Sequence, residues 1–138
     1  MWGGKHFYFG DNITVGVRDL DLAIRWYQEK LGLHRSDGYA GDDVDALLLL
    51  SKNDDIGLGL LVLGPDFSPN DLQGHPILYS SKIEAAHEDF VGSEVNVGPI
   101  QKDSGGNRFF RFQDLDGNTV EVCVEPGTRS RSLLVLAV

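Results

Sequence analysis

Hydrophobic positions in the first part of the chain follow two different periods. They alternate with polar positions over residues 12–18, which is typical of a strand with one buried face. They then recur at helical spacing from Leu20 to Leu31, where Asp19 can cap a helix and Gly32 can end it. Three more strands are predicted after this helix, at about 34–40, 44–51 and 55–63. This segment therefore predicts the order strand, helix, strand, strand, strand.

The same order returns after a connection at 64–74 that is rich in proline, glycine and aspartate. The second pattern predicts a strand at 75–81, a helix at 83–90, and strands at about 94–98, 107–113 and 118–125, the last two joined by an Asp-Gly turn. Equivalent positions pair Asn12 with His75, Leu20 with Ile83, Ala23 with Ala86, Tyr27 with Phe90, and Gly59 with Glu121. We therefore predict an α+β fold of two βαβββ modules, at about 10–63 and 75–126, in a single domain spanning 1–138 with a tail at 127–138.

One module cannot bury both faces of its sheet, because its helix covers only one of them. Two modules side by side therefore give paired curved mixed sheets whose uncovered faces enclose a cleft. Alternation along the first module predicts that Asn12 and seven further residues face this cleft. The seven are Thr14, Gly16, Arg18, Gly57, Gly59, Leu61 and Leu63. The second module contributes His75, Ile77, Tyr79, Phe109, Arg111, Glu121 and Cys123. The intervening residues, including Val62, Phe110, Phe112 and Val124, are predicted to be core.

Glycines on the cleft face carry a prediction of their own. Glycine weakens a strand, so Gly16, Gly57 and Gly59 on one face indicate unfilled space where a ligand or another backbone approaches. An apolar lining from the first module and polar groups from the second are typical of a small-molecule site.

Composition limits the partners of the chain. The 138 residues carry a formal net charge of −9, which disfavours nucleic acid and anionic membrane surfaces as partners. No apolar run is long enough to cross a bilayer, and the N-terminus has no signal-peptide pattern. A single cysteine, Cys123, excludes a disulfide scaffold and favours the reducing cytoplasm.

The sequence resembles the vicinal oxygen chelate superfamily of glyoxalase I, extradiol dioxygenases and bleomycin-resistance-type binding proteins. The residues that carry the resemblance are 17–23, 26–27 and 31–33 in the first module, and 112–118 and 120–122 in the second. The resemblance implies the paired-sheet fold, a homodimer, and four metal-ligand positions, which here are Asn12, Gly59, His75 and Glu121. His75 and Glu121 suit a divalent metal such as Zn, Ni, Fe or Mn. Gly59 has no side-chain ligand and the Asn12 amide oxygen is a weak one, so the set is incomplete.

Two functions follow from this incomplete set. The first is a protein that binds a small organic molecule in the cleft without a catalytic metal. We predict that its binding residues are Asn12, Gly59, Leu61, Tyr79, Phe109 and Arg111, with Arg111 as a candidate anchor for an anionic group. The alternative is a metal-dependent glyoxalase-like lyase or isomerase, or a dioxygenase. In it His75 and Glu121 hold the metal and Glu121 is the catalytic base.

Each candidate residue also has a structural interpretation. His75 can be a surface histidine, Arg111 an exposed strand arginine, and Cys123 a small buried apolar residue. His34 and His87 belong to no motif and are predicted to lie on the surface. The aromatic-rich segment 2–9 is predicted to cover a sheet edge or a dimer seam, and the apolar residues 133–138 to pair with an edge or a neighbouring subunit.

Overall fold

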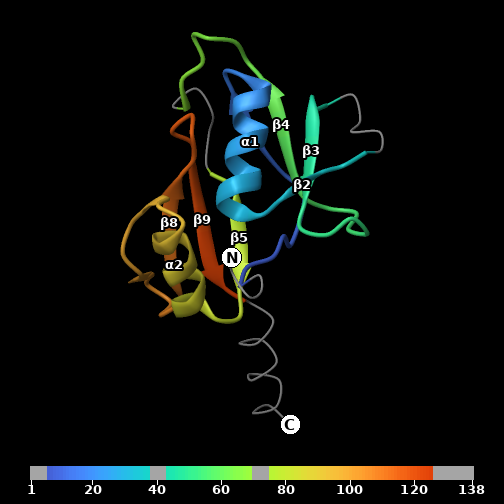
Figure 1. The fold of residues 1–138 in the computed structure, drawn as a ribbon. Helices are drawn as coiled ribbons and strands as arrows, with labels where there is room; N and C mark the ends of the chain where they lie inside the picture. The colour runs from blue at the N-terminus through green and yellow to red at the C-terminus, as the bar shows by residue number, and fades with distance from the viewer. Residues whose placement is uncertain (1–5, 38–42, 70–74, 126–138) are drawn as a thin grey trace.

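Two modules, each a sheet with one helix against it, make up the computed structural model, which describes residues 6–37, 43–69 and 75–125 (Figure 1). Module one contains β1 (Ile13–Val17), α1 (Leu20–Leu31), β2 (His34–Arg35), β3 (Ala46–Leu49) and β4 (Leu58–Val62). Module two contains β5 (Ile77–Ser80), α2 (Ile83–Gly92), β6 (Asn96–Val97), β7 (Gln101–Lys102), β8 (Arg108–Gln113) and β9 (Thr119–Val124). The predicted α+β class and the repeated element order are confirmed.

Both sheets are mixed and have equivalent strand orders. Module one has the order β1-β4-β3-β2, and module two has β5-β9-β8-β6 with β7 paired to β8. The pairs β1–β4 and β5–β9 are parallel, and the remaining strand pairs are antiparallel. The sequence missed β7, because this strand is two residues long and both residues are exposed, so it has no hydrophobic alternation.

The first helix begins and ends where its capping residues predict. The Asp19 carboxylate accepts a hydrogen bond from the backbone N–H of Leu22 at 3.0 Å. Gly32 closes the helix with a φ of 69°, a left-handed conformation that glycine adopts without steric cost. The second helix runs to Gly92, two residues beyond the predicted end at residue 90.

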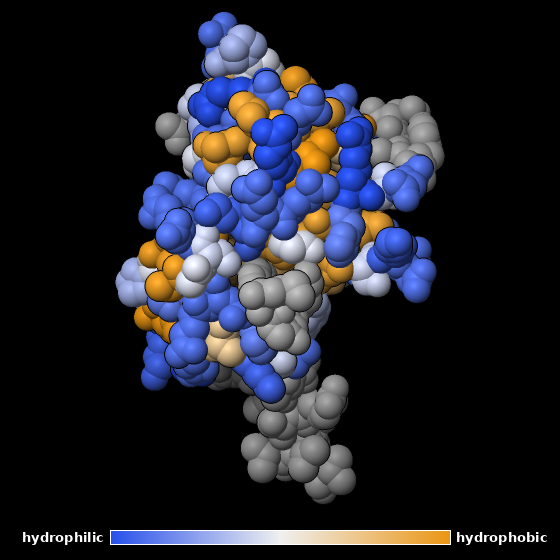
Figure 2. All heavy atoms as spheres, in the orientation of Figure 1, coloured by the Kyte–Doolittle hydropathy of each residue, from blue (hydrophilic) through white to orange (hydrophobic). Residues whose placement is uncertain are grey.

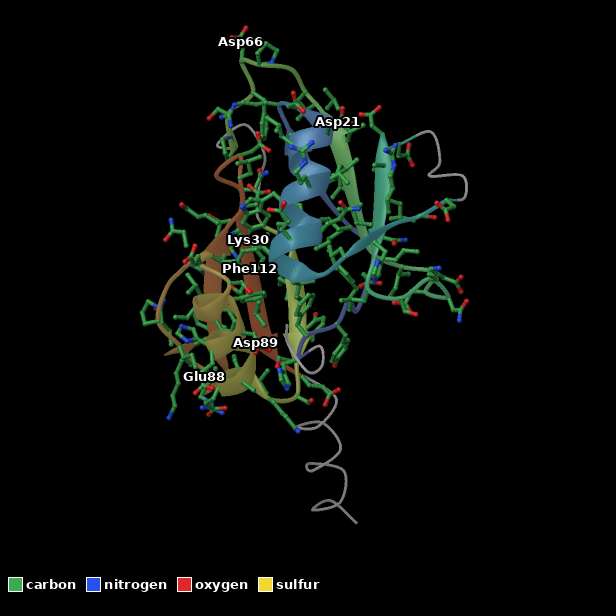
Figure 3. The ribbon with its side chains drawn as sticks, viewed as in Figure 1. Asp21, Lys30, Asp66, Glu88, Asp89 and Phe112 are labelled. Atoms are coloured by element: carbon green, nitrogen blue, oxygen red, sulfur yellow. The ribbon has the colours of Figure 1, made fainter. Side chains whose placement is uncertain are left out.

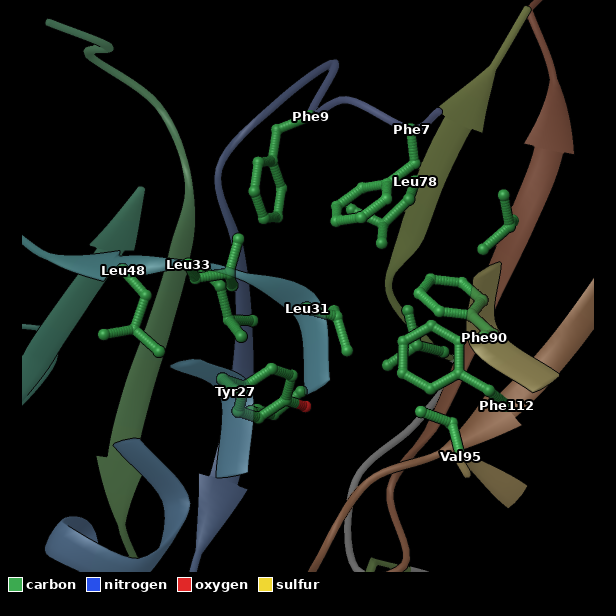
Figure 4. Close-up of a cluster of buried hydrophobic side chains, with 14 of the residues drawn as sticks. Phe7, Phe9, Tyr27, Leu31, Leu33, Leu48, Leu78, Phe90, Val95 and Phe112 are labelled. Carbon is green, nitrogen blue, oxygen red and sulfur yellow. The ribbon is translucent and has the colours of Figure 1, made fainter. Parts of the chain in front are cut away.

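One hydrophobic core joins the two modules (Figure 4). It includes Tyr27 of α1 and an aromatic group in which Phe90 of α2 packs against Phe110 and Phe112 of β8, with ring centroids 5.6 and 4.8 Å apart. Strand alternation therefore assigned most of the buried face correctly. Val62 is the exception: it is the last residue of β4 and is 41% exposed, so its prediction as core is wrong. Val124, at the end of β9, is only partly buried.

The N-terminal segment completes this core and the edge of the second sheet. Phe7 and Phe9 are buried, and Figure 4 shows Phe7 beside Leu78. Between them, Tyr8 exchanges two backbone hydrogen bonds with Tyr79 of β5, at 2.8 and 3.0 Å. The described part of segment 2–9 thus covers a sheet edge, as predicted. The predicted pairing of residues 133–138 lies outside the described residues.

Surface chemistry in the described ranges is mostly polar. In the view of Figure 2, hydrophilic residues cover much of the face that carries the helices, with hydrophobic atoms scattered between them. None of the helices in the described ranges is long and apolar enough to cross a membrane. His34 is exposed, whereas His87 is half-buried, bonded to the carbonyl of Gly98 at 2.8 Å and packed edge-on against Phe110. The prediction that His87 is a surface residue is therefore wrong.

Candidate functional site

A cleft of about 810 Å³ lies between the two modules. Module one lines it with Thr14 and Gly16 of β1 and with Leu61 and Leu63 at the end of β4. These residues alternate with the buried core residues of the same strands, so the cleft lies on the face that α1 leaves uncovered. Its volume falls in the range of roughly 300–1,000 Å³ that is usual for small-molecule sites.

Module two lines the opposite side with polar side chains. Arg111 and Gln113 come from β8, Asn118 and Thr119 from the start of β9, and His75 from the approach to β5. The sequence placed His75 and Arg111 at the cleft together with Leu61 and Leu63, and the structure brings these four residues to it. It did not single out Gln113, Asn118 or Thr119, because they flank the Asp-Gly turn and were assigned to the turn or to strand ends.

Glu121 is the centre of a hydrogen-bonded cluster beside the cleft. Its Oε1 atom lies 3.1 Å from Nε2 of His75 and accepts a hydrogen bond from Nε of Arg111 at 3.1 Å. Its Oε2 atom accepts a hydrogen bond from the Cys123 thiol at 2.8 Å. Burial of Glu121 opposes its ionisation, but the hydrogen bonds from Cys123, His75 and Arg111 together outweigh burial and lower the pKa of the carboxyl group. Glu121 is therefore a poor proton acceptor.

The same cluster protects the thiol of Cys123. Burial, the hydrogen bond to Glu121 and the negative charge of that carboxylate raise the pKa of Cys123 to about 12. A thiol with this pKa is protonated at neutral pH, and the thiolate is the reactive form. Cys123 is therefore suited to hydrogen bonding and unsuited to act as a nucleophile.

The donor set beside the cleft does not by itself make a metal centre. His75 and Glu121 are adjacent, as the sequence predicts for a ligand pair. Within the described ranges, however, no group of three or more His, Cys, Asp or Glu residues could hold a metal ion. Three protein ligands are the usual minimum for a catalytic metal. The guanidinium of Arg111 also shares Oε1 of Glu121, so a cation bound to that oxygen would lie beside a fixed positive charge.

The remaining predicted binding residues lie away from the cleft lining. The Asn12 amide oxygen accepts a hydrogen bond from the backbone N–H of Gly57 at 3.0 Å, which ties the start of β1 to the chain before β4. Tyr79 and Phe109 share the uncovered face of sheet two with Arg111, and both are half-buried there. Phe109 pairs with Gln101 of β7, whereas Tyr79 lies on β5 at the opposite edge of the sheet.

The prediction of open space is wrong for Gly16 and Gly59, whereas Gly57 lies against another backbone, which is the other possibility that the sequence indicated. A Cβ atom at Gly59 would lie 2.5 Å from Cγ1 of Val44, and one at Gly16 would lie 2.6 Å from Cδ1 of Leu63. At Gly57 it would lie 2.1 Å from the backbone oxygen of Leu48. Neighbouring groups of the protein already occupy these spaces, so the glycines permit close internal packing.

A second polar cluster, buried between the modules except for the exposed Arg18, holds the end of the cleft in place. We call it the inter-module clamp; its residues are Arg18, Tyr27, Asp114, Asp116 and Asn118. The Tyr27 hydroxyl donates to Asp114 at 2.6 Å, and the Asn118 amide donates to the backbone oxygen of Gly16 at 2.8 Å. Asp116 accepts hydrogen bonds from the backbone N–H and the guanidinium of Arg18 at 3.0 and 3.2 Å. Arg18, predicted to face the cleft, is thus committed to the clamp.

Burial sets the protonation behaviour of this clamp. Burial and the adjacent Asp114 carboxylate raise the pKa of Tyr27 well above its usual value. Burial also raises the pKa of Asp114, although the hydrogen bonds from Tyr27 and Asn118 act in the opposite direction. Outside the clamp, Lys30 at the end of α1, labelled in Figure 3, donates to the backbone oxygen of Ser93 at 2.9 Å. The relative position of the modules is therefore fixed by polar contacts as well as by the core.

Paired mixed sheets, a helix on each and a cleft between them define a protein built from two βαβββ modules. The family model described as the Glyoxalase/Bleomycin resistance protein/Dioxygenase superfamily matches residues 11–122, and the chain belongs to this superfamily. The resemblance seen in the sequence is thereby confirmed.

Solved structures with the same fold are distant in sequence. One is a member of this superfamily from Sphaerobacter thermophilus, with 19% identity, a TM-score of 0.62, and coverage of 83% of this chain and 96% of that chain. TnmS3, an antibiotic binding protein from a Streptomyces species, has 23% identity, a TM-score of 0.62, and coverage of 83% and 93%. The fosfomycin resistance protein FosX from Mesorhizobium loti has 16% identity, a TM-score of 0.56, and coverage of 94% and 98%. No curated protein sequence matches this chain.

Proposed function

We propose that this protein binds a small organic molecule in the inter-module cleft and that binding requires no catalytic metal. One observation carries the proposal: both oxygens of Glu121 are engaged by His75, Arg111 and Cys123 at the side of a cleft of ligand size. A carboxylate held in this way serves to position the basic side chains around it. The role is of the kind named for TnmS3, although the likeness to that structure extends to the fold alone.

The ligand contacts that we propose come from both modules. Leu61 supplies apolar surface, and Arg111, Gln113 and Thr119 supply hydrogen-bonding groups. Tyr79 and Phe109 extend this surface on sheet two for a larger ligand. Asn12 and Gly59, which the sequence also predicts to bind the ligand, would act indirectly by shaping the strands of module one.

A neutral fluorescent probe tests this function. N-phenylnaphthylamine is apolar and increases its emission when it leaves water, so the wild type is expected to bind it with a stoichiometry of one per cleft. Leu61→Trp places a larger side chain in the cleft and is expected to weaken binding at least about tenfold, because the probe and the indole compete for one space. Val91→Trp is the matched control, since Val91 is 54% exposed on α2.

The proposal would be contradicted by two results. The first is a wild type that fails to bind the probe stoichiometrically. The second is equal binding by the wild type and Leu61→Trp, which would place the probe elsewhere on the surface. Tm values of both variants, measured by circular dichroism, distinguish a filled cleft from an unfolded protein.

The alternative function is a metal-dependent glyoxalase-like lyase or isomerase, or a dioxygenase, with His75 and Glu121 as ligands. Its support is the adjacency of these two side chains at equivalent strand positions. Elemental analysis of the purified protein discriminates between the two functions. Stoichiometric Zn, Ni, Fe or Mn that is lost in His75→Ala would favour the alternative. A protein that neither contains metal nor takes up added metal supports the metal-free function.

We also retain a homodimer as a prediction. Its support is that the uncovered face of sheet two carries partly exposed hydrophobic residues, among them Ile77 at 36% exposure. Light scattering coupled to size-exclusion chromatography measures the mass directly, and a monomer at micromolar concentration would contradict the prediction.

A further inference from the structure

The cleft differs in charge from the rest of the protein. The chain has 21 Asp and Glu residues against 12 Lys and Arg. Among the described residues that line the cleft there is no acidic side chain, whereas Arg111 and His75 are both present. Glu121 is not among the lining residues, and its carboxylate contacts both of these side chains. An acidic protein thus lines this cleft with basic side chains and no acidic one among the described residues.

The amide of Gln113 offers hydrogen-bond donors to a ligand in the cleft. The Gln113 side-chain oxygen accepts from Asn96 at 3.0 Å, which leaves the amide N–H groups of Gln113 for a ligand. The Asn118 side-chain nitrogen is already committed, to Gly16 and Asp114 at 2.8 and 2.9 Å. A ligand beside Gln113 can therefore use acceptors of its own, whereas Asn118 offers it no donor.

Arg111 is held in an orientation that leaves its terminal nitrogens available. Its Nε atom donates to Glu121 at 3.1 Å, and its guanidinium carbon lies 5.2 Å from the ring centroid of Phe109. These two contacts fix the plane of the guanidinium, and 48% of the side chain remains exposed. Within the described residues the terminal nitrogens have no other partner. A planar pair of N–H donors of this kind matches the two oxygens of an oxyanion.

Apolar surface faces these donors from module one. Leu61 and Leu63 lie on that side of the cleft with Ile13, and Pro76 adds apolar surface on the side of module two. A ligand that fills the cleft therefore has an apolar body and one end that accepts hydrogen bonds from a cation.

We propose that the ligand is an apolar organic molecule with one oxyanion group, a carboxylate or sulfonate, bound by the terminal nitrogens of Arg111. This inference rests on the proposed function and specifies the chemical class of its ligand. Arg111 acts here as a binding residue, and Glu121 and Phe109 act as positioning residues that hold it.

A matched pair of probes isolates the oxyanion. Anilinonaphthalene sulfonate carries the same fused and pendant rings as N-phenylnaphthylamine with an added sulfonate. The wild type is expected to bind the sulfonate probe more tightly than the neutral one. Arg111→Gln is expected to weaken sulfonate binding by about tenfold to a hundredfold, the usual effect of losing a charge-assisted hydrogen bond, and to leave neutral-probe binding within about twofold.

Two further variants control this experiment. Arg108→Gln removes an arginine from the same strand, but Arg108 pairs with Glu84 of α2 and does not line the cleft, so both probes are expected to bind as in the wild type. Arg111→Lys keeps the charge and loses the planar pair of donors. We expect it to bind the sulfonate with intermediate affinity.

The outcomes separate the two proposals. If the neutral probe binds in the cleft while Arg111→Gln weakens both probes equally or neither, the oxyanion inference is overturned and the proposed function stands. If the neutral probe fails to bind the wild type, the proposed function itself fails. A sulfonate affinity that falls in Arg108→Gln as much as in Arg111→Gln would also overturn the inference, because it would reflect general charge.

Discussion

Two equivalent turns show how the modules have diverged. The offset that relates Gly59 to Glu121 also relates Asp54, in the turn before β4, to Asp116, in the turn before β9. In module one, Asp54 accepts a hydrogen bond from the backbone N–H of Ser51 at 3.0 Å, in an exposed turn. In module two, Asp114 makes the same kind of bond to the backbone of Asp116 and Asn118, at 2.9 Å each, in a buried turn.

The difference lies in what surrounds the two turns. Water can replace any hydrogen bond that the exposed turn loses, whereas the buried turn has only the clamp residues as partners. An aspartate that accepts hydrogen bonds from the backbone of its turn therefore closes a surface loop in module one. In module two such an aspartate belongs to the clamp that joins the modules. The following changes test whether burial accounts for this difference.

The largest effect is expected for Asp114→Ala. This change removes the acceptor for the Tyr27 hydroxyl and for the Asn118 amide, and leaves buried donors without partners. We expect a loss of about 3–5 kcal/mol in the free energy of unfolding, measured by urea denaturation. Asp54→Ala removes the side-chain acceptor for a backbone N–H in the exposed turn, although Asp54 is equivalent by offset to Asp116, and it is expected to cost less than about 1 kcal/mol. Equal losses in the two variants would show that burial does not distinguish the turns.

A smaller effect is expected for Tyr27→Phe, which removes one hydroxyl from the clamp. The change removes a charge-assisted hydrogen bond in the core and keeps the ring, so we expect a loss of about 1.5–3 kcal/mol. Tyr8→Phe is the control, because Tyr8 donates to Glu125 at 2.7 Å at a partly buried site outside the clamp. It is expected to cost about 0.5–1.5 kcal/mol. A larger loss for Tyr8→Phe would place the dominant anchor at the N-terminal segment.

The smallest effect concerns the pH dependence of stability at the cleft. Because the pKa of Glu121 is lowered from its usual 4.5, ionised Glu121 stabilises the fold above that value. This contribution is lost as the pH falls through the lowered pKa. The Tm difference between wild type and Glu121→Gln is therefore expected to shrink as the pH is lowered below 4.5. A Tm difference that stays constant or grows toward acid pH would contradict this assignment.

The spacing of hydrophobic residues along the chain predicted the fold well, because it depends directly on which side chains are buried. The βαβββ repeat and the buried face of β8 follow from alternation or helical spacing, and the caps of α1 follow from the residue types of Asp19 and Gly32. The family resemblance rests on the same stretches. Errors occur where burial ends: Val62 lies at a strand end, and β7 is too short and too exposed to show a period.

The candidate site was predicted less completely, because it depends on which polar side chains form hydrogen bonds with one another. Alternation placed Arg111 and Glu121 on one face, but their bond through Nε and Oε1 depends on cross-strand register. The strand glycines looked like open space, since the sequence does not reveal that Val44 and Leu63 occupy it. Asp114 was assigned to a turn, and its partner Tyr27 is far away along the chain.

The protonated state of Cys123 has a practical consequence for chemical labelling. With its pKa raised to about 12 by burial and by Glu121, this thiol stays protonated at pH 7. It is also the only cysteine in the chain. Maleimide and iodoacetamide reagents should therefore leave the native protein almost unmodified, and a cysteine introduced at an exposed position such as Lys52 would be labelled selectively. Fluorophores or spin labels could then report on the two modules without prior removal of the native thiol.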